Sequence, residues 1–267
     1  MTAISAQLVK ELRDQTGAGM MDCKRALTET NGDMEAAVRL LREWGAASAA
    51  KRAGRQTPEG KVGYRITDDA KRGTMVAIGC ETEPVSNNDG FLSFAEKVLE
   101  AVEAGGPGAE ASLEEERVEL SGKLGENVVV VGATRFEAVD GAAVNGYAHP
   151  PANKIGVLVQ VRGGHPELGR KLAMHIAASS PQWVGREDVP EDLVTSEREI
   201  YLSSDEVQSK PEQARDKIVE GMLNKRFFAA QVLAEQVWIH DTAKSVSQVL
   251  HEEGAEVLEF ERHALTE

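Results

Sequence analysis

Two short helices joined by a glycine turn, which displays two adjacent methionines, are the feature of this sequence that most constrains its fold. Gly17 and Gly19 permit positive φ and a sharp reversal of the chain. Met20 and Met21 are flexible, polarizable side chains that suit an irregular partner surface, although both could instead belong to a three-helix core. Neighbouring helical positions point about 100° apart, so a small domain cannot easily bury both. We therefore expect one of them to face solvent and the segment to serve docking rather than chemistry.

The first 54 residues are predicted to form three short helices, because their apolar residues recur at helical spacing. Asp33 stands where an N-cap belongs, directly after an Asn31–Gly32 turn. Gly45 is expected to end the third helix, and Ala46–Gly54 to follow as a connector with a solvated charged face. The arrangement matches a ubiquitin-associated-like (UBA-like) module, assigned to residues 1–54.

A β-hairpin is predicted next, because the apolar period changes to two from Gly60 and a polar turn at Asp68–Gly73 separates two such runs. A loop at Glu81–Asp89 then leads into an amphipathic helix. Its apolar residues are Phe91, Phe94, Val98, Leu99 and Val102. A helix at about Leu113–Leu124 and a strand at Val128–Val131 complete a first α+β subdomain, assigned to residues 55–141.

The same order of elements appears a second time. Gly146–Tyr147 resembles the earlier Gly63–Tyr64, a strand is predicted at Ile155–Val161, and a helix follows through Leu168–Ile176. We therefore predict a second, related α+β subdomain from residues 142–180 and 237–267, with strand and helix signals that resume at Val237.

The segment 181–236 departs from this plan. Helical patterns at Glu191–Leu202 and Glu212–Leu233, with Pro211 between them, predict an antiparallel helical hairpin inserted into the second subdomain. Such a projecting pair is either a solvent-supported scaffold or an interaction arm. The fold class is therefore α+β, with a helical N-terminal module and a helical insertion.

Charge and composition argue against several classes of function. A net charge of −14, from 44 acidic and 30 basic residues, does not suit direct binding of nucleic acid. Cys23 and Cys80 lie in unrelated segments, so no disulfide or thiolate metal site is expected, and no cofactor is expected because Gly105–Gly108 lacks the lysine of a phosphate loop. No apolar run approaches the roughly 20 residues that cross a bilayer, and the start lacks signal-peptide features. We expect a cytoplasmic protein that does not bind membranes.

The loop that follows Cys80 is the most function-like loop of the chain. Ser86, Asn87 and Asn88 are candidate N-caps for the helix after it. Carboxylates beside a thiol could also form an acid/base or nucleophilic site, but that enzyme hypothesis needs Cys80 to be exposed with a lowered pKa.

Two histidines and two tryptophans also need a structural or a functional interpretation. His149, before Pro150–Pro151, is either part of a capped strand end or a partner contact. His175 has apolar neighbours on a helix and is predicted to be structural. Trp183 and Trp238 are predicted to be core or interface anchors.

Three stretches of the chain resemble the bacterial translation elongation factors Ts. They are the run Thr16–Lys24, the helix start Asn31–Asp33 and the basic stretch Ala49–Gly54. The resemblance implies a guanine-nucleotide exchange factor that acts by protein binding and is not an enzyme. It would bind the GDP-loaded elongation factor Tu, disturb its magnesium site and promote exchange of GDP for GTP.

Relatives carry a Thr-Asp-Phe-Val tip that enters the GTPase, and the corresponding residues here are Thr82, Glu83, Pro84 and Val85. Glu83 keeps the negative charge, whereas Pro84 replaces the aromatic wedge. Loss of most of a buried aromatic side chain weakens such a contact by roughly 1.5 to 3 kcal/mol. A pre-set proline loop offsets part of this. The alternative is therefore a diverged elongation factor Tu-binding protein without efficient exchange.

The resemblance also implies docking contacts at Arg13, Met20 and Met21, and a secondary contact at His149. It implies that the helical hairpin is an interaction arm, which could support a homodimer or a 2:2 complex. Because the chain stops soon after Phe260–Arg262, we expect it to lack the final helical module that some members add.

Overall fold

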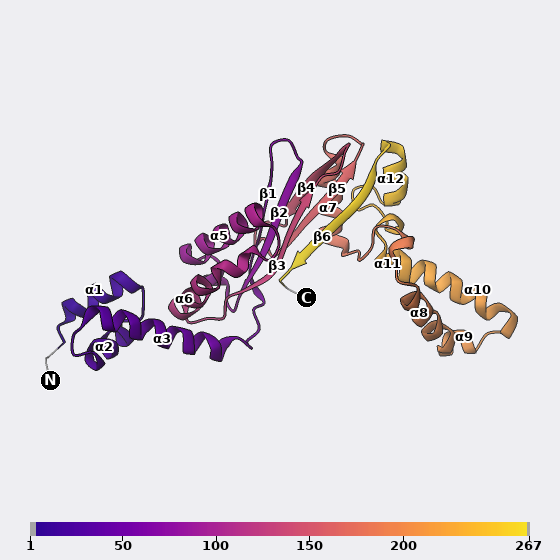
Figure 1. Ribbon diagram of the computed structural model, residues 1–267. Coiled ribbons are helices and arrows are strands. Elements are labelled where there is room, and N and C mark those ends of the chain that lie inside the picture. The colour runs from indigo at the N-terminus through magenta and orange to yellow at the C-terminus, as the bar shows by residue number, and fades with distance from the viewer. Residues whose placement is uncertain (1–3, 266–267) are drawn as a thin grey trace.

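Two three-stranded antiparallel sheets packed face to face form the centre of the computed structural model, which describes residues 4–265 (Figure 1). The first sheet has the order β1-β2-β3 and the second β4-β5-β6. The strands are β1 Glu59–Ile66, β2 Arg72–Cys80, β3 Val129–Glu137, β4 Ala142–Ala148, β5 Ile155–Arg162 and β6 Glu256–Ala264. The predicted α+β class is confirmed.

The N-terminal module consists of three helices, as predicted. They are α1 Ala6–Thr16, α2 Met20–Glu29 and α3 Met34–Arg52. The Asp33 carboxylate accepts a hydrogen bond from the Ala36 N–H at 2.9 Å, which confirms the predicted N-cap. Gly17 has a left-handed φ of 69° and ends α1, whereas Gly19 precedes α2 with an ordinary φ of −60°.

The prediction that Gly45 ends the third helix is wrong. Helix α3 continues through Gly45 and an alanine-rich stretch to Arg52. Gly45 instead lies against Gly122 of α6 (Glu114–Leu124), where a Cβ on Gly122 would stand 3.0 Å from the Gly45 Cα. The glycine therefore permits a close helix–helix contact and not a left-handed turn.

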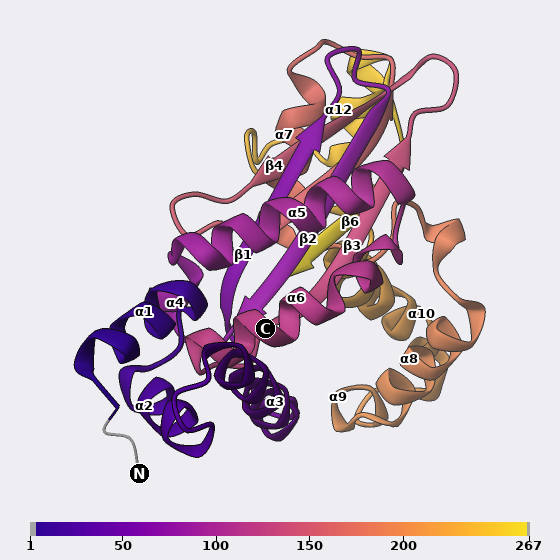
Figure 2. The ribbon, with the colours of Figure 1, turned by 60° about the vertical axis from the view of Figure 1, so that its left-hand side comes forward.

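Helices cover the outer face of each sheet and leave the inner faces to each other (Figure 2). Helices α5 (Asp89–Gly105) and α6 cover the first sheet, with a short 3₁₀ turn at Ala109–Leu113 between them. Helices α7 (Leu168–Ser179) and α12 (Val246–Glu253) cover the second. The middle strand β2 is consequently buried on both faces from Gly73 to Cys80.

The predicted repeat is confirmed by the topology of the two sheets. In each, a hairpin is followed by helices and then by a third strand that pairs with the middle strand. The register between the second and third strands shifts at Ala77/Ile78 in the first sheet and at Gln160/Val161 in the second. Such shared irregularities show that the two halves have the same plan in detail.

The inserted segment is helical and projects from the second sheet, on the side away from the N-terminal module (Figure 1). Its helices are α8 Glu191–Ser203, α9 Asp205–Gln208, α10 Glu212–Met222 and α11 Ala229–Gln231, with a π-helical stretch at Leu223–Phe228 and 3₁₀ turns at Arg186–Asp188 and Leu233–Glu235. A separate apolar cluster, which includes Val219, Leu223 and Phe227, holds it together.

The strand signal at Val237 was misleading. Val237 forms only an isolated bridge with Ser245, and both Val237 and Ile239 are exposed in a loop. Trp238 between them is buried in the core of the second half, as predicted for an anchor, and Trp183 packs against the core of the inserted helices. Within residues 4–265, no helix is both long and apolar enough to span a membrane.

Candidate functional site

The segment after β2 is more ordered than the predicted loop. Thr82 precedes a single helical turn, α4 (Glu83–Ser86), with Pro84 in its first turn. The side chain of Asn88, one of three predicted caps, accepts from the Gly90 N–H at 2.9 Å and starts α5. The Ser86 hydroxyl instead donates to the Glu83 carbonyl at 2.8 Å. The tip, defined as Thr82–Val85, is therefore part of a short, hydrogen-bonded helical turn.

Three of the four tip residues are available to a partner. Thr82, Glu83 and Pro84 are exposed, whereas Val85 is half-buried against the apolar core beneath α5. The tip thus presents a carboxylate and a proline ring to solvent, while Val85 anchors it to the body.

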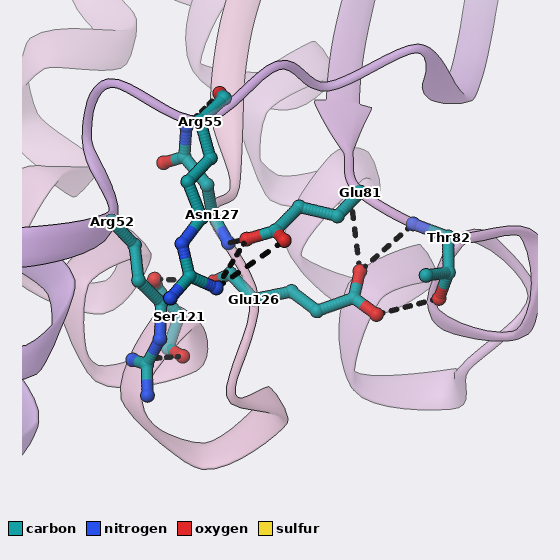
Figure 3. Close-up of polar contacts among 7 residues, drawn as sticks. All are labelled: Arg52, Arg55, Glu81, Thr82, Ser121, Glu126 and Asn127. Atoms are coloured by element: carbon teal, nitrogen blue, oxygen red, sulfur yellow. Dashed lines mark hydrogen bonds and ion pairs between the residues drawn. The ribbon is translucent and has the colours of Figure 1, made fainter.

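A carboxylate from the turn between α6 and β3 holds the start of the tip (Figure 3). Oε2 of Glu126 accepts hydrogen bonds from the backbone N–H groups of Glu81 at 3.1 Å and Thr82 at 3.0 Å. Its Oε1 accepts from the Thr82 hydroxyl at 2.5 Å. Charge-assisted hydrogen bonds of this kind are stronger than neutral ones.

A second set of contacts fixes Glu81 (Figure 3). Its Oε1 accepts from the Asn127 N–H at 2.7 Å, and its carboxylate pairs with Arg55 at 3.4 Å. The Asn127 side-chain amide donates to the Arg55 carbonyl at 2.9 Å. Glu81 lies in the loop predicted from the sequence, whereas no sequence pattern pointed to its neighbours Arg55, Glu126 and Asn127. Gly125, with a left-handed φ of 73° at the end of α6, is the one local signal that marks the turn.

Cys80 does not meet the condition for a reactive thiol. It is fully buried, and its Sγ donates to the Thr82 carbonyl at 3.3 Å. Burial, with a smaller contribution from the nearby Glu126 carboxylate, raises the pKa of Cys80 to about 11. The thiol is therefore protonated at neutral pH, and its role is to hold the tip backbone.

The docking candidates of the N-terminal module are more exposed than predicted. The sequence predicts that one methionine faces solvent, but Met20 is 45% and Met21 72% exposed. Cys23, Ala26 and Leu27 fill the core face of α2 instead. Arg13 is also exposed, on α1. The module therefore displays two apolar side chains and a cation.

His149 lies in the turn between β4 and β5 and is exposed. Its backbone closes that turn through hydrogen bonds with Ile155 and Asn153, and its Nδ1 lies 2.9 Å from the Tyr147 hydroxyl. Lys154 of the same turn pairs with Glu59 at 2.5 Å, and Glu59 stands opposite Cys80 in the first sheet. His149 and the tip therefore lie at the same end of the two sheets, whereas Arg13, Met20 and Met21 belong to the separate helical module.

His175 is structural, as predicted. It is fully buried and stacks on Trp238 with ring centroids 5.2 Å apart. Its Nδ1 accepts from the Ile239 N–H at 3.3 Å, so its Nε2 carries the proton donated to Gln236 at 2.9 Å. Burial lowers the pKa of His175, which favours the neutral ring.

The structure thus combines a braced, exposed tip with a helical module that carries apolar side chains on its outside. A family model described as Elongation factor TS matches residues 81–267. The chain is 43% identical to elongation factor Ts of Thioalkalivibrio sulfidiphilus, over 99% of this chain and 92% of that protein. It is 41% identical to elongation factor Ts of Citrobacter koseri, over 100% of this chain and 93% of that protein. The chain belongs to the elongation factor Ts family, whose members are translation elongation factors in protein biosynthesis.

Proposed function

We propose that this chain binds elongation factor Tu in its GDP form and accelerates GDP release by inserting the tip Thr82–Val85 near the magnesium site. The exposed carboxylate of Glu83, on a turn held rigidly by Glu126, is the observation that carries the proposal. A negative charge brought close to the nucleotide's phosphates and its metal would weaken their mutual attraction.

The proposed exchange is a matter of linkage and involves no covalent step. A factor that binds the nucleotide-free GTPase more tightly than the GDP form must weaken GDP binding by the same free energy. In this proposal, the part of the affinity that does not depend on the bound nucleotide comes from Arg13, Met20 and Met21. His149, at the same end of the sheets as the tip, adds a secondary contact.

The ordered conformation of the tip supports these separate roles, in which the helical module provides affinity and the tip promotes GDP release. A loop that is already ordered loses little conformational entropy when it enters a partner, so more of its contact energy is available to displace the nucleotide. The ring of Pro84, in the first turn of α4, fixes φ and further restricts the conformations of the tip before binding.

A fluorescent-GDP release assay with purified elongation factor Tu tests the proposal. Catalytic amounts of the chain should speed release, and Glu83→Gln should slow it while binding of the GTPase persists. A matched control is Glu187→Gln, an exposed glutamate in the inserted segment, which should have no effect. Binding without faster release would support the other candidate, a diverged partner-binding protein, for which the missing aromatic side chain at Pro84 is the motivation.

A further inference from the structure

Every polar backbone and side-chain group of Thr82 is held by a residue outside the tip. Its N–H and hydroxyl donate to Glu126, and its carbonyl accepts from the thiol of Cys80 and from the Ser86 N–H. Thr82 is the last residue before the helical turn α4. The direction in which the tip leaves the body is therefore set at Thr82, together with the neighbouring Glu81, whose N–H also donates to Glu126.

The Thr82 hydroxyl does not cap helix α4, although Thr82 is the residue just before that helix. A threonine at the N-cap of a helix commonly accepts a hydrogen bond from the first turn. Here Thr82 makes no such bond, and its hydroxyl points to Glu126 instead, at 2.5 Å. The local helix thus forgoes a cap in favour of a contact with a turn that lies 44 residues later in the chain.

The turn that carries Glu126 is itself anchored. The Ser121 hydroxyl donates to the Glu126 carbonyl at 2.5 Å, and the Ser121 carbonyl accepts from Arg52, the last residue of α3, at 3.4 Å. These contacts, drawn in Figure 3, make a continuous path from the N-terminal module through the end of α6 to the tip.

We propose that Glu126 is a positioning residue for nucleotide exchange: its carboxylate fixes Thr82 so that Glu83 and Pro84 enter the partner in one orientation. This inference rests on the proposed function of the tip. Glu126 is placed to act through geometry, because both of its oxygens already accept hydrogen bonds from Glu81 and Thr82.

Three substitutions at this position separate geometry from charge. Glu126→Gln keeps the length, its carbonyl oxygen can accept from both backbone N–H groups, and its amide can donate to the Thr82 hydroxyl. Glu126→Asp keeps the charge but is one methylene too short. Glu126→Ala removes both.

The first measurement uses the full chain alone. Amide hydrogen exchange at Glu81 and Thr82 should quicken by about tenfold in the Ala and Asp variants, as expected when charge-assisted hydrogen bonds are lost. The Gln variant should stay close to the parent. Thr82→Val, which removes only the hydroxyl, should loosen the tip without touching α6 and serves if a Glu126 variant does not fold.

The second measurement is GDP release from elongation factor Tu at saturating factor. The maximal release rate should fall by about tenfold in the Asp and Ala variants and be rescued in Gln, while the dissociation constant changes little, because orientation rather than docking is lost. Glu110→Ala is the matched control, since that carboxylate also accepts a backbone N–H, from Gly108, but away from the tip.

The outcomes are distinct. Activity retained in Asp and lost in Gln would show that charge matters and would overturn the positioning role, as would unchanged amide exchange and release in all three variants. If the parent chain does not speed GDP release, the proposed function fails, while the amide exchange data still decide whether Glu126 holds the tip.

Discussion

In the proposed exchange reaction, Pro84 is the tip residue whose substitution gives the most direct test. It lies exposed in the first turn of α4, at the position where the family resemblance implies an aromatic wedge. Its ring buries less apolar surface in a partner than a phenyl group, although it stiffens the turn.

Pro84→Phe should raise the rate of GDP release from elongation factor Tu. Burial of the added aromatic surface is worth roughly 1.5 to 3 kcal/mol, which corresponds to a gain of about tenfold or more if it is realised in the nucleotide-free complex. Val139→Phe is the matched control, because Val139 is also exposed but follows the far end of β3. A gain in both variants, or in neither, would contradict the wedge argument.

His175 makes the stability of the second half depend on pH. Burial lowers the pKa of this histidine, so the folded chain binds its proton more weakly than the unfolded chain does. As the pH falls through the ordinary histidine value of about 6.5, protonation therefore favours unfolding. The stabilising contribution is fully present above that value and is lost below it.

Thermal unfolding of the parent and of His175→Gln, measured from about pH 7.5 to about pH 5.5, checks this argument. The parent's Tm should fall more steeply over that interval than that of the variant, whatever the difference between them at neutral pH. Parallel curves would show that His175 contributes no such dependence.

At the scale of elements, the contact between α3 and α6 holds the N-terminal module on the body. The helices meet at Gly45 and Gly122, with an ion pair between Arg42 and Glu119 at 3.2 Å beside them. The two glycines are not equivalent, because a Cβ on Gly45 would stand 3.8 Å from the Gly122 Cα, an ordinary contact, whereas the reverse distance is 3.0 Å.

Gly122→Ala should therefore loosen the module, while Gly45→Ala should be tolerated. Both changes raise helix propensity by up to about 1 kcal/mol, so the difference between them isolates the steric contact. Gly221→Ala in α10, where the added methyl meets nothing within 4 Å, should simply stabilise the chain. Limited proteolysis after α3 and thermal unfolding measure these effects; equal behaviour of the Gly45 and Gly122 variants would contradict the prediction.

Elements that depend on residues a few positions apart could be predicted from the sequence. Features that depend on contacts between residues far apart in the chain could not. The Asp33 cap and the hairpin of β1 and β2 follow from residues a few positions apart. The role of Gly45 depends on Gly122, which no local pattern reveals. In the candidate site, the tip could be found by resemblance, but its brace by Glu126 is a contact between segments that are unrelated in sequence.

At the scale of the whole molecule, the inserted helices form an arm with its own apolar core and an exposed isoleucine, Ile200, on α8. A single exposed apolar side chain needs no partner of its own, so Ile200 serves here as the point at which the self-association implied by the family resemblance is tested. The expected homodimer or 2:2 complex would use this surface.

Light scattering at several protein concentrations tests whether the arm mediates dimerisation. The parent should show the mass of a dimer that dissociates on dilution, and Ile200→Glu should be monomeric with an unchanged Tm, because the side chain lies outside the core. Val131→Glu, at an exposed position on β3, is the control. A monomeric parent at all concentrations would remove this role from the arm.

The position of the arm in the chain also orders events during synthesis on the ribosome. The first sheet is complete once β3 has emerged, but the second waits for β6, which follows the whole inserted segment. Until then β5, an apolar strand, has one unpaired edge, and Leu265 is missing from the core between the sheets. A nascent chain of this architecture therefore exposes an unpaired, aggregation-prone edge of β5 until late in translation. Binding of a chaperone would protect the chain most at that stage.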